Sequence, residues 1–149
     1  MRFFVIEVPL YRILGALTPQ KSTGKFTTFN SEHLYIKDWI IRENIKQEHS
    51  YFVDIGAGDG IDMSNMYLLA KDGWRGVSIE ADELRFAQLS QTYRSLPKIS
   101  LFRTFVTQSN ILNILKSANI PTNFQVLSLD IDGADLYIAE SLLTQFRPK

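Results

Sequence analysis

Cysteine is absent from the 149 residues of this chain. Its absence excludes disulfides, thiolate zinc sites and cysteine nucleophiles, and it leaves the redox compartment undetermined. An excess of charge of either sign is also lacking, because 16 Lys and Arg side chains balance 16 Asp and Glu side chains. A neutral chain has no overall attraction for nucleic acid or for an anionic membrane, so we expect neither as a partner.

Long hydrophobic runs are missing as well. Residues 1–6 begin like a signal peptide, but Glu7, Pro9 and Arg12 interrupt the apolar run before it reaches the length of a secretory signal. No stretch approaches the roughly 20 apolar residues of a membrane span. We therefore expect a soluble, cytoplasmic protein, with a peripheral membrane contact by residues 3–17 as the alternative.

The patterns that are present predict strands that alternate with helices. Residues 1–30 are interpreted as an N-terminal segment and polar connector, and residues 31–149 as one domain. Within that domain, apolar runs predict strands at 51–55, 74–80, 99–106 and 124–131, and amphipathic spacing predicts helices at 31–44, 61–72, 82–96, 111–118 and 134–146. This alternation is typical of an α/β fold, a Rossmann-like three-layer αβα arrangement around a parallel sheet.

A glycine-rich loop, Asp54 to Gly60, joins the first of these strands to the next helix. Its glycines allow a tight turn and a close approach of a ligand to the backbone, and the expected helix offers free N–H groups. The loop lacks a P-loop lysine, and Ile61 stands where a dinucleotide fold has its third glycine. Asp54 would repel a pyrophosphate but suits a ligand with an ammonium group. The alternative is a tight turn with an exposed Asp.

Glu80 ends the second predicted strand. A carboxylate in that position can accept hydrogen bonds from both hydroxyls of an adenosine ribose. Enzymes that bind NAD use the same contact, so Glu80 favours a nucleoside ligand without choosing between cofactors. The alternative is a solvent-facing Glu at the end of a strand.

Three blocks of the sequence, at 54–60, 73–82 and 126–135, together resemble the FkbM-like branch of class I S-adenosylmethionine-dependent methyltransferases. The resemblance covers residues 51–147. It implies a methyltransferase that uses S-adenosylmethionine, with O-methylation of a small molecule or glycan as the expected reaction. The implied cofactor-binding residues are Asp54, Gly56, Ala57, Gly58, Gly60, Glu80, Ala81 and Val106.

The chain departs from the methyltransferase pattern in two respects. Many members carry an Asp after the third strand that binds adenine, whereas residues 105–110 hold no acid. Adenine would then depend on the backbone near Val106, on Gln108 or on Asn110. The class I fold also has seven strands, and this chain supplies the first four, in the order 3-2-1-4, so we expect a domain that is incomplete at its C-terminus.

In such a sheet the fourth strand, 124–130, would be an apolar edge. An exposed edge of that kind promotes association. We therefore expect either a fragment of a longer protein or a homo-oligomer that covers the edge. Cover by the N-terminal segment, residues 3–17, is the alternative.

Three acidic residues follow the fourth strand. Asp130 is the predicted catalytic residue, because strand carboxyl ends face the ligand crevice and a carboxylate can deprotonate a hydroxyl acceptor. Asp132 and Asp135 are interpreted as starting and capping the last helix. These oxygens could alternatively hold Mg²⁺ or Ca²⁺, although we expect no metal. His33 and His49 are interpreted as surface or interface residues.

These observations leave three hypotheses for function. The first is an S-adenosylmethionine-dependent methyltransferase. The second is a non-catalytic nucleotide-binding module, or a fragment that lacks the substrate side. The third, an NAD-type oxidoreductase, is disfavoured by Asp54 and Ile61.

Overall fold

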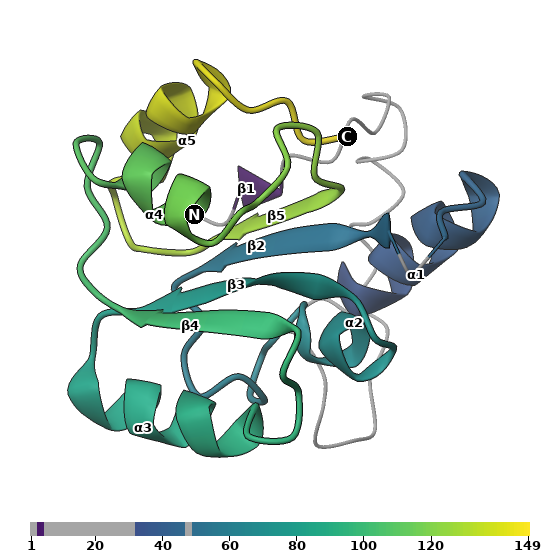
Figure 1. Ribbon diagram of the computed structural model, residues 1–149, viewed down its shortest axis with the longest axis horizontal. Coiled ribbons are helices and arrows are strands. Elements are labelled where there is room, and N and C mark those ends of the chain that lie inside the picture. The colour runs from purple at the N-terminus through teal and green to yellow at the C-terminus, as the bar shows by residue number, and fades with distance from the viewer. Residues whose placement is uncertain (1–2, 5–31, 47–48) are drawn as a thin grey trace.

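The computed structural model describes residues 3–4, 32–46 and 49–149. A sheet with the strand order β1-β5-β2-β3-β4 runs through the molecule (Figure 1). The strands are β1 (Phe3–Phe4), β2 (Tyr51–Ile55), β3 (Arg75–Glu80), β4 (Ile99–Arg103) and β5 (Val126–Leu129). Strands β2, β3, β4 and β5 are the first to fourth strands predicted from the sequence, and they are all parallel. The structure therefore confirms the predicted α/β class and, in the numbering of the predicted strands, the order 3-2-1-4.

Helices cover both faces of this sheet. They are α1 (Glu32–Arg42), α2 (Tyr67–Lys71), α3 (Glu83–Thr92), α4 (Ile111–Ser117) and α5 (Asp135–Leu143). Helices α4 and α5 pack on one face, and α1, α2 and α3 on the other (Figure 1). Across the described residues, none of these helices has the length and apolar character needed to cross a membrane.

The alternation of side chains along the strands explains the two cores. In β2, Val53 and Ile55 pack toward α4 and α5, whereas Phe52 packs toward the helices of the opposite face. All four residues of β5 are buried. Strands that are covered on both faces favour continuous apolar runs, which is why these segments could be predicted from the sequence.

The helix predicted at 61–72 is wrong in its first half. Asp59 Oδ1 accepts hydrogen bonds from the backbone N–H groups of Ile61 and Asp62, both at 2.8 Å. Ser64 Oγ accepts from Met66 N and Tyr67 N, so helix α2 begins only at Tyr67. Side chains that bond to nearby backbone in this way compete with helix formation. The glycine loop is therefore not followed directly by a helix N-terminus, and the expected dipole at the loop is missing.

The prediction that the fourth strand has an unpaired edge is also wrong at two positions. Strand β1 pairs with β5 in antiparallel orientation, with Phe3 opposite Leu129 and Phe4 opposite Ser128. Unpaired strand edges gain hydrogen bonds from a partner of this kind. The homo-oligomer predicted through this edge loses its basis at these positions, while the connector predicted before residue 31 lies outside the described residues.

Candidate functional site

Two adjoining hollows lie at the carboxyl ends of the parallel strands. The smaller, of about 80 Å³, is lined by Asp54, Ala57 and Gly58 among others. The larger, of about 540 Å³, is lined by residues that include Glu80, Ala81 and Val106. The residues shared by both hollows are Gly56, Met63, Arg85 and Asp130. The structure thus brings the sequence-predicted residues together, except Gly60, which lines neither hollow.

The three glycines of the loop differ in what a side chain in their place would contact. A Cβ at Gly56 would lie 2.0 Å from the carbonyl oxygen of Asp130, and one at Gly60 would lie 2.7 Å from Leu89 Cδ1. Packing therefore explains these two glycines without a ligand. A Cβ at Gly58 would meet no atom within 4 Å, although its φ of +61° also favours glycine. Gly58 alone of the three faces open space.

Glu80 ties the glycine loop to the start of α3. Its Oε2 accepts a hydrogen bond from Gly58 N at 2.8 Å, and its Oε1 accepts one from Asp82 N at 2.8 Å. The side chain is 8% exposed, so the carboxylate is fixed at the wall of the larger hollow. Each carboxylate oxygen keeps a further lone pair, and the group can accept additional bonds from a ligand.

Asp54 lies near the carboxyl end of the central strand β2 and lines the smaller hollow. Its register partners are Ser78 on β3 and Ser128 on β5. The pKa of Asp54 is raised to about 7: burial is the main cause, a hydrogen bond with Ser128 opposes it, and the charges of Asp130 and Glu80 add to it. A buried carboxylate of this kind gains most when a cation arrives beside it.

One buried polar atom in the lining of the smaller hollow, Asn65 Oδ1, lacks a hydrogen-bond partner within the described part of the chain. Asn65 lines the smaller hollow together with Asp54. Burial and the charge of Asp54 raise the pKa of the nearby Tyr93, while hydrogen bonds with Ser64 and Ser78 lower it. Unpaired buried polar atoms cost about 1–3 kcal/mol each, so this part of the molecule is suited to a polar ligand.

The two hollows are strongly acidic. Among the described residues, their lining contains a single basic side chain, Arg85, and the carboxylates of Asp54, Asp62, Glu80, Asp130 and Asp132. Arg85 has no ion-pair partner in the part of the chain that the structure covers. The site as a whole therefore favours a ligand with net positive charge that also carries one anionic group.

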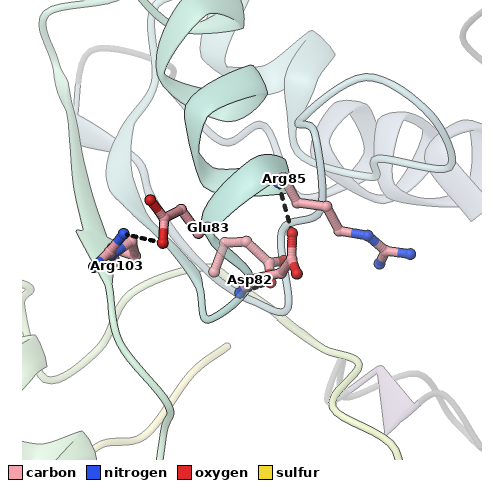
Figure 2. Close-up of polar contacts among 5 residues, drawn as sticks. Asp82, Glu83, Arg85 and Arg103 are labelled. Atoms are coloured by element: carbon pink, nitrogen blue, oxygen red, sulfur yellow. Dashed lines mark hydrogen bonds and ion pairs between the residues drawn. The ribbon is translucent and has the colours of Figure 1, made fainter.

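The first turn of α3 places Arg85. Asp82 caps this helix by accepting a hydrogen bond from Arg85 N at 2.9 Å, and Glu83 pairs with Arg103 at 3.2 Å. Figure 2 shows the side chain of Arg85 extending away from the Glu83–Arg103 pair. Arg85 was missed by the sequence analysis. A signal was present, because a cation in the first turn of a helix opposes the helix dipole and needs another reason to be there.

The acidic residues after β5 have separate places. Asp130 is half-buried and lines both hollows, and Asp132 is exposed and lines the larger one. Asp135 begins α5, but its carboxylate accepts hydrogen bonds from Ile131 N and Gly133 N rather than capping the helix. The predicted capping role of Asp132 is wrong, because no side chain caps α5 and residue 134 holds the cap position.

The remaining candidates lie away from the hollows. Gln108 donates a hydrogen bond to the carbonyl of Tyr137, and the side chain of Asn110 bonds to the backbone of Thr107 and Phe105. Of the residues predicted to hold adenine, only Val106 lines a hollow. His33 and His49 line neither hollow. In the described ranges no group of three or more His, Asp or Glu side chains is placed to hold a metal ion.

No protein-family model matches this chain, and a search of curated proteins finds no match. What the structure defines is a Rossmann-like α/β domain with acidic hollows at the carboxyl ends of its strands. In open α/β sheets this edge is where ligands bind.

Proposed function

We propose that this chain binds S-adenosylmethionine in the two acidic hollows and transfers its methyl group to an oxygen of a small-molecule or glycan acceptor. The observation that carries the proposal is the lining, with five carboxylates and one arginine among the described residues. S-adenosylmethionine has an ammonium, a sulfonium and one carboxylate, so its charges match this lining. The pyrophosphate of a dinucleotide would be repelled by it.

The ribose and the adenine of S-adenosylmethionine each have a matching surface in the larger hollow. The ribose hydroxyls would donate to Glu80, whose carboxylate is already oriented by two backbone N–H groups. Adenine would lie in the larger hollow against Val106, next to the exposed ring of Phe105. The volume of about 540 Å³ is in the range of small-molecule sites.

The amino-acid part would occupy the smaller hollow. Asp54 would accept hydrogen bonds from the ammonium, and the amide oxygen of Asn65, which has no partner among the described residues, would accept a further one. Arg85 would pair with the ligand carboxylate, since no protein carboxylate in the described residues neutralises it. A charged group at each end of the ligand fixes its orientation.

Asp130 is the residue best placed for chemistry. It lines both hollows and so lies where they adjoin. The bound cofactor supplies an activated methyl group whose transfer releases a neutral thioether, so much of the catalysis is positioning. A carboxylate at this junction can accept the proton of an acceptor hydroxyl as the new C–O bond forms.

Calorimetry with S-adenosylhomocysteine tests the binding proposal. We expect Glu80→Ala to weaken binding by about 1.5–3 kcal/mol, the range for hydrogen bonds to charged groups. Arg85→Gln should weaken it by about tenfold, whereas Arg94→Gln, which removes a charge from outside both hollows, should not. Tighter binding of NAD or adenosine diphosphate than of S-adenosylhomocysteine would refute the proposal.

Methyl transfer itself needs a second measurement. We expect Asp130→Asn to keep its affinity for S-adenosylhomocysteine and to lose turnover in a radiolabelled methyl-transfer assay with hydroxyl-bearing acceptors. Asp72→Asn, on the exposed end of α2, is the matched control. EDTA should leave turnover unchanged. Equal loss of binding and turnover in Asp130→Asn would place Asp130 in the cofactor site, and cofactor binding without any transfer would favour the non-catalytic module.

A further inference from the structure

A separate hollow of about 290 Å³ lies at the amino ends of β2, β3 and β4, the edge opposite the acidic site. Tyr51 begins β2 and is the register partner of Arg75, which begins β3. Lys98 directly precedes Ile99, the register partner of Gly76. The three side chains therefore lie abreast on neighbouring strands. We call this feature the basic hollow; its polar lining is Tyr51, Arg75, Lys98, Ser100 and Asn119.

The charge of the basic hollow has one sign. Arg75 and Lys98 both line it, and none of its described lining residues is Asp or Glu. Neither cation has an ion-pair partner in the described ranges. Like charges side by side on adjacent strands destabilise a sheet. An anion between them would remove that repulsion.

The two cations are held in place by neutral partners. Arg75 lies over the ring of Tyr51, 5.9 Å from its centroid, and donates from Nη1 to Tyr51 Oη at 3.2 Å. Lys98 Nζ donates to the carbonyl of Gly73 at 3.1 Å. Each contact uses one donor, so the guanidinium and the ammonium keep most of their hydrogen-bonding capacity.

Capping of helix α4 does not explain the cations. The C-terminal end of α4 leads into the lining residues 118–120. The carbonyls of Ile114, Leu115 and Lys116 already accept backbone hydrogen bonds from the three residues that follow the helix. Arg75 and Lys98 are therefore not needed to satisfy this helix end.

We infer that the basic hollow binds a small phosphate monoester. The phosphate would lie between the Arg75 guanidinium and the Lys98 ammonium, which bind phosphate as a planar fork and as a point charge. The polar remainder of the ligand would contact Ser100 and Asn119. This site is independent of the proposed methyl transfer, because none of its residues lines the acidic hollows.

Amide NMR with ribose 5-phosphate tests the inference, with ribose and matched sodium chloride as controls. We expect saturable shifts at Gly76, Ser100 and Asn119 with the phosphate ester only. Arg75→Gln and Lys98→Gln should each weaken binding by about tenfold, and the double variant should not saturate. Lys116→Gln, which removes a cation of α4 outside the hollow, should bind like the unchanged chain.

Several outcomes would overturn the inference. They are absence of saturable binding, equal affinity in the Arg75 and Lys98 variants, and shifts centred on Gly58 at the other edge. Thermal unfolding of each variant identifies loss of fold, and Lys98→Gln keeps the Tyr51–Arg75 contact if Arg75→Gln unfolds. The last experiment is sedimentation of the chain with phosphatidic acid vesicles. Vesicle binding without a response to ribose 5-phosphate would overturn the inference and assign the site to a lipid headgroup. Unchanged S-adenosylhomocysteine affinity in these variants keeps this test separate from the proposed function.

Discussion

Gly58 is the residue of the glycine loop at which the proposed ligand can be tested most directly. Its Cβ position is open, whereas the Cβ positions of Gly56 and Gly60 are blocked by Asp130 and Leu89. Gly58→Ala should weaken S-adenosylhomocysteine binding by at least tenfold, because the added methyl group occupies the surface where the ligand approaches the loop. The positive φ adds a loss of stability of about 1–2 kcal/mol, because an L-residue with a Cβ is strained in the left-handed region.

Gly133→Ala separates these two effects. Gly133 also has a positive φ, +94°, and its Cβ would also meet no atom within 4 Å, but the residue lines neither acidic hollow. It should lose stability in denaturant unfolding and keep its affinity in calorimetry. Normal binding by Gly58→Ala, or equal loss in both variants, would contradict the role given to Gly58.

At the residue scale the sequence predicted the acidic site only in part. Asp54 and Glu80 could be found because a short loop and a strand end fix their places. Asn65 and Met63 could not, since they line the site only because the chain turns at residues 61–66 instead of continuing as a helix. Phe105 carries no sequence pattern that distinguishes a site residue from an exposed aromatic.

Helix α3 is the element that connects the acidic site to the rest of the fold. Asp82 caps it, and the backbone N–H of the same residue bonds to Glu80. Asp82→Ala should lower the free energy of unfolding by about 1 kcal/mol, as is usual for loss of an N-cap. It should also weaken S-adenosylhomocysteine binding modestly, because fraying of the first turn loosens Arg85.

Glu83→Ala is the comparison within the same turn. It removes the ion pair with Arg103. The side chain of Arg103 is 52% exposed and that of Glu83 is 81% exposed. Exposed pairs contribute little, and a carboxylate in the first turn of a helix contributes about 0.3–1 kcal/mol, so urea unfolding should show a loss no larger than that of Asp82→Ala. A larger destabilisation in Glu83→Ala than in Asp82→Ala would show that capping does not stabilise α3.

At the element scale, periodicity predicted the four parallel strands and most helices, because those segments are covered by one core or by two. The exception is the start of α2, where Asp59 and Ser64 bond to the backbone and replace helical hydrogen bonds. The pairing of β1 with β5 could not be predicted from local sequence patterns either, because a two-residue strand carries no periodicity.

The whole molecule is neutral, but its charge is separated between the two edges of the sheet. Carboxylates gather at the carboxyl ends of the strands, and Arg75 and Lys98 lie at the amino ends. Composition gives only the zero net charge. Strand polarity creates the separation, because parallel strands bring all their carboxyl ends to one edge of the sheet and all their amino ends to the other.

Asp54 links the acidic edge to the stability of the whole fold. Its pKa is about 7 in the folded chain, above the ordinary value of 3.8. Between these values the folded state binds a proton that the unfolded state has released, so the contribution of Asp54 to stability falls as pH rises. Urea unfolding of the unchanged chain and of Asp54→Asn should therefore diverge from pH 4.5 to 7.5. The unchanged chain should lose on the order of 3 kcal/mol relative to the variant.

Ligand binding should show the opposite trend. An ammonium beside Asp54 favours the ionised carboxylate, so affinity for S-adenosylhomocysteine should rise by up to about tenfold per pH unit toward pH 7 and then level off. Asp54→Asn should bind weakly with a flat pH profile, while Asp72→Asn, an exposed acid outside the hollows, should follow the unchanged chain. Calorimetry from pH 5.5 to 8 measures both effects. If the unchanged chain and Asp54→Asn kept parallel profiles, the ligand ammonium would lie elsewhere, and the pH dependence would belong to the other carboxylates of the acidic edge.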